Sequence, residues 1–354
     1  MDFQKYSQEF RAKAENAGYS EENILLCINY AEKLFRKKVP IIYTTSHLAA
    51  LVGYQKNYLK RAVKRPEFFY REFKIKKRNG DYRVINEPLT SLKEIQFWLL
   101  KNILYKIPVS RYAKAYIKKR TIIDNVKFHK NQKSVLSIDI EDFFSSISFQ
   151  LVEDIFLKVG YSELISNLLA KLCCLDQKLP QGAPTSPAIS NIVLYSFDQS
   201  IASFCKKNDV RYTRYADDLT FSSDLKSINW DELISLIENK LTDVGLKLNR
   251  DKTRIMTNSQ RQIVTGIVVN EVIQVPKEKR KKIRQIIYYI KKFGLESQLK
   301  FFLDKNKNLK NKNRWTIENY LNHLIGSVNY MLYLKKNDQE LLDYKSYLLE
   351  LKNT

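Results

Sequence analysis

The chain contains few of the residues that build zinc sites. Only four of its 354 residues are cysteines, no two of them form a CxxC pair, and only three histidines are present. Zinc sites usually combine four such ligands at short spacings. We therefore expect no zinc centre, and we expect free, mostly buried thiols in a reducing compartment.

Long apolar runs are also missing. No stretch approaches the roughly 18 consecutive apolar residues that a membrane-spanning helix needs. The start of the chain, MDFQKYSQEF, is polar and lacks the apolar region of a signal peptide. These features predict a cytoplasmic protein with no membrane partner.

Acidic residues are the minority among the charges. The chain has 61 Lys and Arg against 38 Asp and Glu, which gives a net charge of +23. A charge this large most often serves a polyanionic partner, and nucleic acid is the commonest one. A solvated, lysine-rich surface is the alternative explanation. Hydrophobic residues make up 44% of the chain, so a buried core is expected.

The pattern of the sequence changes along the chain. Residues 5–38 have helical spacing, and residues 46–64 predict one or two short helices with Ser46 as the N-cap. Residues 68–85 predict two strands joined by an Asn-Gly turn. Past Pro276 the sequence is helical and basic, with 14 Lys and Arg against 3 acidic residues in 276–314. This order predicts an α+β fold.

The centre of the chain mixes short strands with helices. The β-branched run 135–140 predicts a buried strand, and 211–223 predicts a strand, a turn and a second strand. Residues 150–175 are typical of helices, and 189–205 predict one long helix after a loop at 179–187.

Two acidic clusters stand out in this basic protein. Asp139 to Asp142 end the apolar strand, and Asp217-Asp218 lie at the predicted hairpin turn. Crowded carboxylates raise each other's pKa unless a cation joins them, and Mg²⁺ prefers such ligands together with substrate phosphates. Two ions could activate an attacking hydroxyl and neutralise a leaving pyrophosphate. Helix capping and turn formation are the alternative roles, and capping is the better explanation for Asp142 alone.

Basic residues and a glycine loop could complete a nucleotide site. Residues 54–83 hold 11 Lys and Arg against 3 acidic residues. Four of them surround the tight turn and could clamp a triphosphate, namely Lys76, Lys77, Arg78 and Arg83. Any one of them alone is better explained as a solvated surface charge. The loop Gln181-Gly-Ala-Pro184 could pass close to a sugar or base.

These motifs together resemble the reverse transcriptases. The tetrapeptide Tyr215-Ala-Asp-Asp218 resembles the YxDD box, SIDIEDFFSSI resembles motif A, LPQGAPTSPAISN motif B, and GLKLNRDKT motif D. GDYRVINEP and the following helix resemble the fingers motifs, so the resemblance spans about 70–330. It implies a right-hand polymerase with fingers, a palm of antiparallel sheet plus helices, and a helical thumb. The expected boundaries are 1–110 for an N-terminal helical segment and fingers, 111–275 for the palm with a helical insertion at about 150–180, and 276–354 for the thumb.

A narrower resemblance points to bacterial retron reverse transcriptases. Val264-Thr265-Gly266 resembles their VTG signature. Asn125-Val-Lys-Phe-His129 resembles their NAxxH motif, with Val126 in place of the usual Ala. The resemblance implies RNA or DNA binding for Asn125, His129 and the VTG triplet. An ordinary strand with a glycine bulge is the alternative explanation for VTG.

The same resemblance implies roles for single residues in catalysis. Asp139 and Asp217 would be the principal Mg²⁺ ligands, with Asp218 beside them and the Ile140 carbonyl helping. Two Mg²⁺ ions are expected, and Mn²⁺ could substitute for them. Five positions would contact the dNTP: Phe144 by rejecting a 2′-hydroxyl, Arg83 and Lys76 at the triphosphate, Gln181 near the nucleotide, and Lys252 as a proton donor or phosphate contact.

The function that the resemblance implies is that of a retron polymerase. It would copy part of a cognate structured noncoding RNA into branched multicopy single-stranded DNA, primed from an internal 2′-hydroxyl of that RNA. A separate effector protein and a role in antiphage defence would accompany it. Other bacterial reverse transcriptases, of group II intron, diversity-generating or abortive-infection type, are alternatives, although no maturase or endonuclease extension follows the thumb-like region. A non-catalytic RNA-binding scaffold is a third possibility, and its mark would be the loss of one of the three aspartates.

Overall fold

The structure is a computed structural model of the chain, and it describes residues 2–77, 80–225, 228–306 and 315–353. Arg78 and the Asn of the predicted Asn-Gly turn lie outside these residues, as do residues 307–314 of the basic segment. The described chain combines many helices with small sheets, which confirms the predicted α+β class. None of its helices has both the length and the apolar composition needed to span a bilayer.

The chain forms two compact units, each assembled from separate stretches of sequence. The first contains Met1–Arg120, Ile138–Leu219 and Asn229–Thr253. The second contains Thr121–Ser137, Thr220–Ile228 and Arg254–Thr354. The expected division into fingers, palm and thumb at residues 110 and 275 stays a prediction.

Helices make up most of the first unit, and polar side chains begin several of them. Thr44 caps α3, because its hydroxyl accepts a hydrogen bond from the His47 N–H, so the prediction of Ser46 as the cap is wrong. The helices of this unit are α1 Phe3–Asn16, α2 Glu21–Arg36, α3 Thr45–Val52, α4 Lys56–Lys64, η1 Pro66–Phe69, α5 Thr90–Asn102, η2 Leu104–Lys106, α7 Phe149–Val159, α8 Glu163–Cys173, α9 Ser186–Val193, α10 Tyr195–Lys207 and α11 Trp230–Thr242.

The predicted single helix at 189–205 is two helices. α9 ends and α10 begins at Leu194, where φ is −83° and ψ is 9°. No glycine or proline marks this break, so the sequence pattern could not show it. Asn191 on α9 and Asp198 on α10 are both buried.

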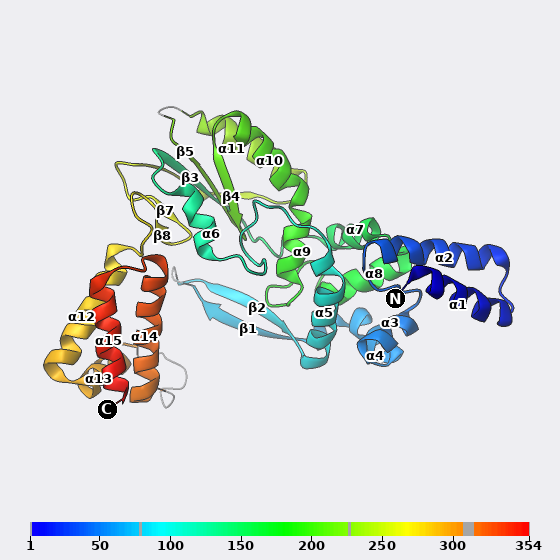
Figure 1. The fold of residues 1–354 in the computed structure, drawn as a ribbon, viewed down its shortest axis with the longest axis horizontal. Helices are drawn as coiled ribbons and strands as arrows, with labels where there is room; N and C mark the ends of the chain where they lie inside the picture. Colours follow the sequence, from blue (N-terminus) through cyan, green and yellow to red (C-terminus); the bar gives the residue numbers. More distant parts are fainter. Residues whose placement is uncertain (1, 78–79, 226–227, 307–314, 354) are drawn as a thin grey trace. The chain divides into compact units, whose positions relative to one another are not determined.

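The strands form a hairpin and a four-stranded sheet, which Figure 1 shows in cyan and in green to yellow. In the hairpin, β1 (Tyr70–Lys76) pairs antiparallel with β2 (Tyr82–Pro88), as the sequence predicted. The sheet has the order β4-β5-β3-β6. Its strands are β3 Ser134–Ile140, β4 Arg211–Tyr215, β5 Asp218–Ser223 and β6 Leu248–Thr257.

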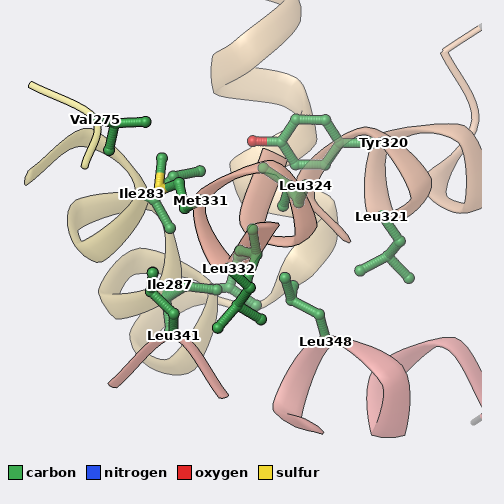
Figure 2. Packing of buried hydrophobic residues seen from close by; sticks show 12 residues of the cluster. Val275, Ile283, Ile287, Tyr320, Leu321, Leu324, Met331, Leu332, Leu341 and Leu348 are labelled. Carbon is green, nitrogen blue, oxygen red and sulfur yellow. The ribbon is translucent and has the colours of Figure 1, made fainter. Parts of the chain in front are cut away.

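The second unit contains a helical bundle with its own core. On α12, Ile283, Ile287 and Ile290 recur at helical spacing and are buried, while the lysines at both ends of the helix are exposed. Figure 2 shows Ile283 and Ile287 among apolar side chains of α14 and α15, and Ile290 belongs to the same cluster. The elements of this unit are α6 Ile122–Val126, η3 Lys127–His129, β7 Ile263–Val264, β8 Ile267–Val268, α12 Lys277–Phe293, α13 Leu295–Lys305, α14 Ile317–Leu334 and α15 Gln339–Asn353.

A charged cluster ties α12 to the start of α15. Arg280 donates from both terminal nitrogens to Asp338, at 2.6 and 2.7 Å, and from Nε to Glu340 at 2.9 Å. Burial alone would raise the pKa of Asp338, but its bonds to Arg280 and Lys335 outweigh burial and hold the pKa at about 2. Arg284 lowers the pKa of Glu340 to about 2, with burial acting in the opposite direction.

These depressed pKa values predict acid sensitivity of the bundle. Free carboxyls titrate near pH 4, so the stabilisation is present above about pH 4 and is lost as the pH falls towards 2. We expect the Arg280→Met variant to melt at a lower temperature than the wild type at pH 7 and to lose less further stability below pH 4. Circular dichroism melts at pH 7, 4 and 2 measure this.

The control for this comparison is Arg261→Met. That variant removes an exposed pair with Glu278 and should change little. Parallel pH profiles for the wild type and Arg280→Met would contradict the assignment.

Candidate active site

The three predicted aspartates come together in the first unit. Asp139 is the penultimate residue of β3, Asp217 lies in the turn between β4 and β5, and Asp218 begins β5. The Ile140 N–H donates to the Asp217 carbonyl at 3.0 Å, which places the end of β3 beside the turn. Ala216 has a φ of 60°, a left-handed conformation that makes this turn tight.

Burial and mutual repulsion shape the charges of this cluster. Burial raises the pKa of Asp218 to about 7, and the charges of Asp217 and Asp139 add to the effect. The pKa of Asp217 is also raised, mainly by burial and then by Asp139. From β6, Lys252 donates through Nζ to Asp139 Oδ2 at 2.7 Å. One ammonium therefore offsets part of the charge of three carboxylates.

The donor set fits a hard divalent cation. Across the described residues, no three His, Cys, Asp or Glu side chains converge closely enough to form a ready-made metal site. However, burial and then mutual repulsion raise the pKa of Asp217 and Asp218, and a bound cation would relieve that repulsion. Oxygen ligands of this kind suit Mg²⁺ or Mn²⁺. Ile140 is buried, and the ligand role of its carbonyl stays a prediction.

Aromatic rings stand next to the aspartates. Phe143 is buried in the core, whereas Phe144 is partly exposed and its ring centroid lies 6.3 Å from that of Tyr116. Burial raises the pKa of Tyr116, and the charge of Asp217 raises it further, so Tyr116 lies within electrostatic reach of the carboxylates. Tyr116 was not among the residues predicted for this site. Its position just before the basic stretch IKKR was the only available signal.

The two predicted triphosphate contacts differ in their placement. Arg83 on β2 is exposed, and its charge lowers the pKa of both Asp217 and Tyr116, although each pKa is raised overall. Lys76 on β1 lies opposite Tyr82 and is also exposed. Within the described part of the chain, no hydrogen bond or ion pair joins Lys76 to the aspartates.

The loop that carries Gln181 packs closely against β2 of the hairpin. The Asn86 N–H of β2 donates to the Gln181 carbonyl at 2.8 Å. Gly182 has a φ of 130°, and a Cβ there would lie 2.8 Å from the Asn86 carbonyl oxygen. Glycine is therefore required for the backbones to approach this closely.

The two retron-like motifs meet each other within the second unit. Asn125 Nδ2 donates to Thr265 Oγ1 at 3.4 Å, and His129 Nδ1 lies 2.8 Å from Ser222 Oγ. Asn125 and His129 are buried, and so is Val264, which packs with Val126 in a small core cluster. The unusual Val126 is thus a core residue.

The VTG triplet forms a tight turn between β7 and β8. Thr265 has a φ of 47° and Gly266 a φ of 79°, and Val264 pairs with Ile267 across the turn. The alternative of a strand with a glycine bulge is wrong. A β-branched residue in the left-handed region is strained, and such strain concentrates at functional sites. Gly266 is exposed, so the turn is the accessible part of this motif pair.

Comparison with protein families defines the class of protein. Residues 75–315 match the family model described as reverse transcriptase (RNA-dependent DNA polymerase). That stretch includes β2, the three aspartates and the VTG turn.

Comparison with individual proteins identifies a narrower group within the reverse transcriptases. The chain is 36% identical over 230 residues to the retron Ec86 reverse transcriptase of Escherichia coli, covering 63% of this chain and 71% of that protein. It is 31% identical to the retron Ec83 enzyme of Escherichia coli, covering 79% of it, and 31% identical to the retron Mx65 enzyme of Myxococcus xanthus, covering 65% of it. The chain belongs to the retron reverse transcriptases.

Solved structures with partial similarity are telomerases. An apo telomerase from Candida tropicalis aligns with a TM-score of 0.46 and 12% identity, over 80% of this chain and 57% of that one. A Candida albicans telomerase in complex with a telomeric RNA fragment aligns with a TM-score of 0.43 and 11% identity, over 80% and 63% of the two chains.

The close approach at Gly182 generates a prediction. Gly182→Ala should displace the loop from β2, because the added Cβ would overlap the Asn86 carbonyl. We expect dNTP incorporation on an RNA template to fall by about tenfold or more, as expected when a loop that positions substrate is displaced. Single-nucleotide extension assays measure the change.

Gly245→Ala is the matched control, since Gly245 has a φ of 70° but no atom within 4 Å of an added Cβ. Equal losses in the two variants would show that backbone strain alone, and not contact with β2, explains the effect.

Proposed function

We propose that this reverse transcriptase copies part of a cognate structured noncoding RNA into branched multicopy single-stranded DNA, as the polymerase of a retron. The observation that carries the polymerase site is the crowding of Asp139, Asp217 and Asp218 at the ends of adjacent strands. All three acids are present, which disfavours a non-catalytic RNA-binding scaffold. The proposal includes a cytoplasmic location and a separate effector protein in antiphage defence.

The aspartates would hold two Mg²⁺ ions, with Mn²⁺ as a substitute. Bound there, the ions supply Lewis-acid activation of the 3′-hydroxyl and neutralisation of the leaving pyrophosphate. Asp139 and Asp217 are the principal ligands, and Asp218 lies beside them. Lys252 already bonds to Asp139, and release from it would free the ammonium for a phosphate oxygen.

The surrounding residues would select and orient the dNTP. Phe144 is the partly exposed ring at the site, and it would exclude the 2′-hydroxyl of a ribonucleotide. Arg83, with Lys76 as a second cation, would bind the triphosphate. Gln181 is held next to β2 and would lie against the incoming nucleotide.

Recognition of the noncoding RNA would involve the second unit. The turn at Thr265 and the exposed Gly266, held by Asn125, would contact it together with His129. The lysines of α12 would bind phosphates, because clustered cations gain affinity by releasing counterions from nucleic acid.

Asp217→Asn tests the metal site. The amide keeps the size of the side chain but removes the charge that a cation requires, so we expect Mg²⁺-dependent incorporation of dNTPs to fall by at least about 100-fold. Asp154→Asn, on α7, removes an exposed acid and should retain full activity. Equal extension by wild type and Asp217→Asn on a primed RNA template would refute the site.

The retron assignment predicts a specific bound RNA. We expect the protein purified from its host to carry one small RNA, identified by sequencing the bound nucleic acid. Asn125→Ala should reduce that enrichment while leaving extension of a generic primer–template intact, because it removes a hydrogen bond to the Thr265 turn and not a contact with the aspartates. Random cellular RNA in the wild-type preparation would count against a retron.

A further inference from the structure

A fully buried ion pair adjoins the turn that carries Asp217. Arg214 on β4 donates from Nε and Nη2 to the two carboxylate oxygens of Asp198 at 2.9 and 2.7 Å, and both side chains are 0% exposed. The Tyr212 hydroxyl also donates to Asp198, at 2.7 Å. The remaining guanidinium nitrogen, Nη1, donates to the Ala216 carbonyl at 3.2 Å. Arg214 therefore fixes the backbone immediately before Asp217.

Asn191 connects this pair to a second part of the site. Its Oδ1 accepts from Arg214 Nη1 at 3.0 Å, and its Nδ2 donates to the Ala115 carbonyl at 3.0 Å. Ala115 precedes Tyr116, whose ring lies next to that of Phe144. Tyr116 has a φ of 61°, so its backbone is strained and depends on its surroundings.

Both ends of the Asn191 amide are therefore used. One leads through Arg214 to the turn of Asp217, and the other leads to the backbone of Tyr116. The side chain is 1% exposed, and an apolar residue of similar size would fill the space without making either bond. The backbone supports the same arrangement, since Lys114 N–H donates to the Arg214 carbonyl at 2.7 Å.

We propose that Asn191 is a positioning residue that sets the Asp217 turn and the Tyr116–Phe144 pair from one amide, and so couples metal binding to sugar selection. This rests on the proposed roles of Asp217 and Phe144. Loss of the amide frees Nη1 of Arg214 to shift relative to Ala216, and it frees the Ala115 carbonyl. Both the divalent cation and the 2′-position of the nucleotide would then be held less tightly.

The test uses the full chain bound to a primer–RNA template whose primer ends in a dideoxynucleotide, so that no chemistry occurs. Mn²⁺ binding is measured by electron paramagnetic resonance, and the Kd values of a dNTP and the matching rNTP are measured in the same complex. For Asn191→Ala we expect Mn²⁺ binding and the dNTP preference each to weaken about tenfold, the factor typical of one lost hydrogen bond to a charged or buried group. Asn167→Ala on α8, which removes an amide bonded to Glu153, is the matched control and should change neither.

Two further variants test separately the effect on the Asp217 turn and the effect on the Tyr116–Phe144 pair. Asn191→Asp keeps the acceptor for Arg214 and loses the donor to Ala115, so sugar preference should fall while Mn²⁺ binding holds. Arg214→Lys keeps the buried charge but loses the fork that reaches Ala216. Arg214→Lys should weaken Mn²⁺ binding without relaxing the preference for dNTP over rNTP. It also tests the proposal if Asn191→Ala does not fold.

A folded Asn191→Ala variant with wild-type Mn²⁺ affinity and wild-type dNTP preference would overturn the proposal and leave Asn191 as a packing residue. Unchanged Mn²⁺ binding in Arg214→Lys would overturn the claim that Arg214 positions the Asp217 turn. Equal Mn²⁺ binding by wild type and Asp217→Asn would instead remove the proposed metal site itself, and the coupling with it.

Discussion

Electrostatic repulsion among three carboxylates is the constraint on which the first unit is built. Asp139, Asp217 and Asp218 are brought to one place by the pairing of β3 with the β4–β5 turn, although burial and proximity raise the pKa of Asp217 and Asp218. The turn is held by bonds that do not involve the acids themselves. The buried Arg214–Asp198 pair fixes the Ala216 carbonyl, and with it the backbone next to Asp217.

The remaining elements carry the groups proposed to bind substrate, or they stabilise the second unit. Gly182 allows the Gln181 loop to lie against β2, the strand that carries Arg83. In the second unit, the apolar face of α12 packs into the bundle core, and its basic face stays exposed. The Thr265 turn depends on Asn125 from a motif 140 residues earlier in the sequence. Two of the residues proposed to contact substrate or RNA, Gln181 and Thr265, are held in place by contacts with β2 and with Asn125.

Local patterns in the sequence predicted the elements but not all of their connections. The strand that carries Asp139 and the β1–β2 and β4–β5 hairpins could be predicted, because β-branched runs and turn residues act over short distances. The break at Leu194 and the left-handed φ of Thr265 could not, since long-range packing imposes both. Tyr116 and Asn191 were missed for the same reason: their roles come from contacts with residues far away in the chain. Family motifs supplied the grouping of the aspartates, which composition alone only suggested.

The central claim is that these aspartates form a cation site that Lys252 occupies in part when no ion is bound. A crystal structure with primer–template, a non-hydrolysable dNTP and Mn²⁺, with the ions located by anomalous scattering, tests this most directly. The account predicts Mn²⁺ bound by Asp139 and Asp217, and the Lys252 ammonium released from Asp139. Mn²⁺ bound only by other residues, with Lys252 still paired to Asp139, would contradict it.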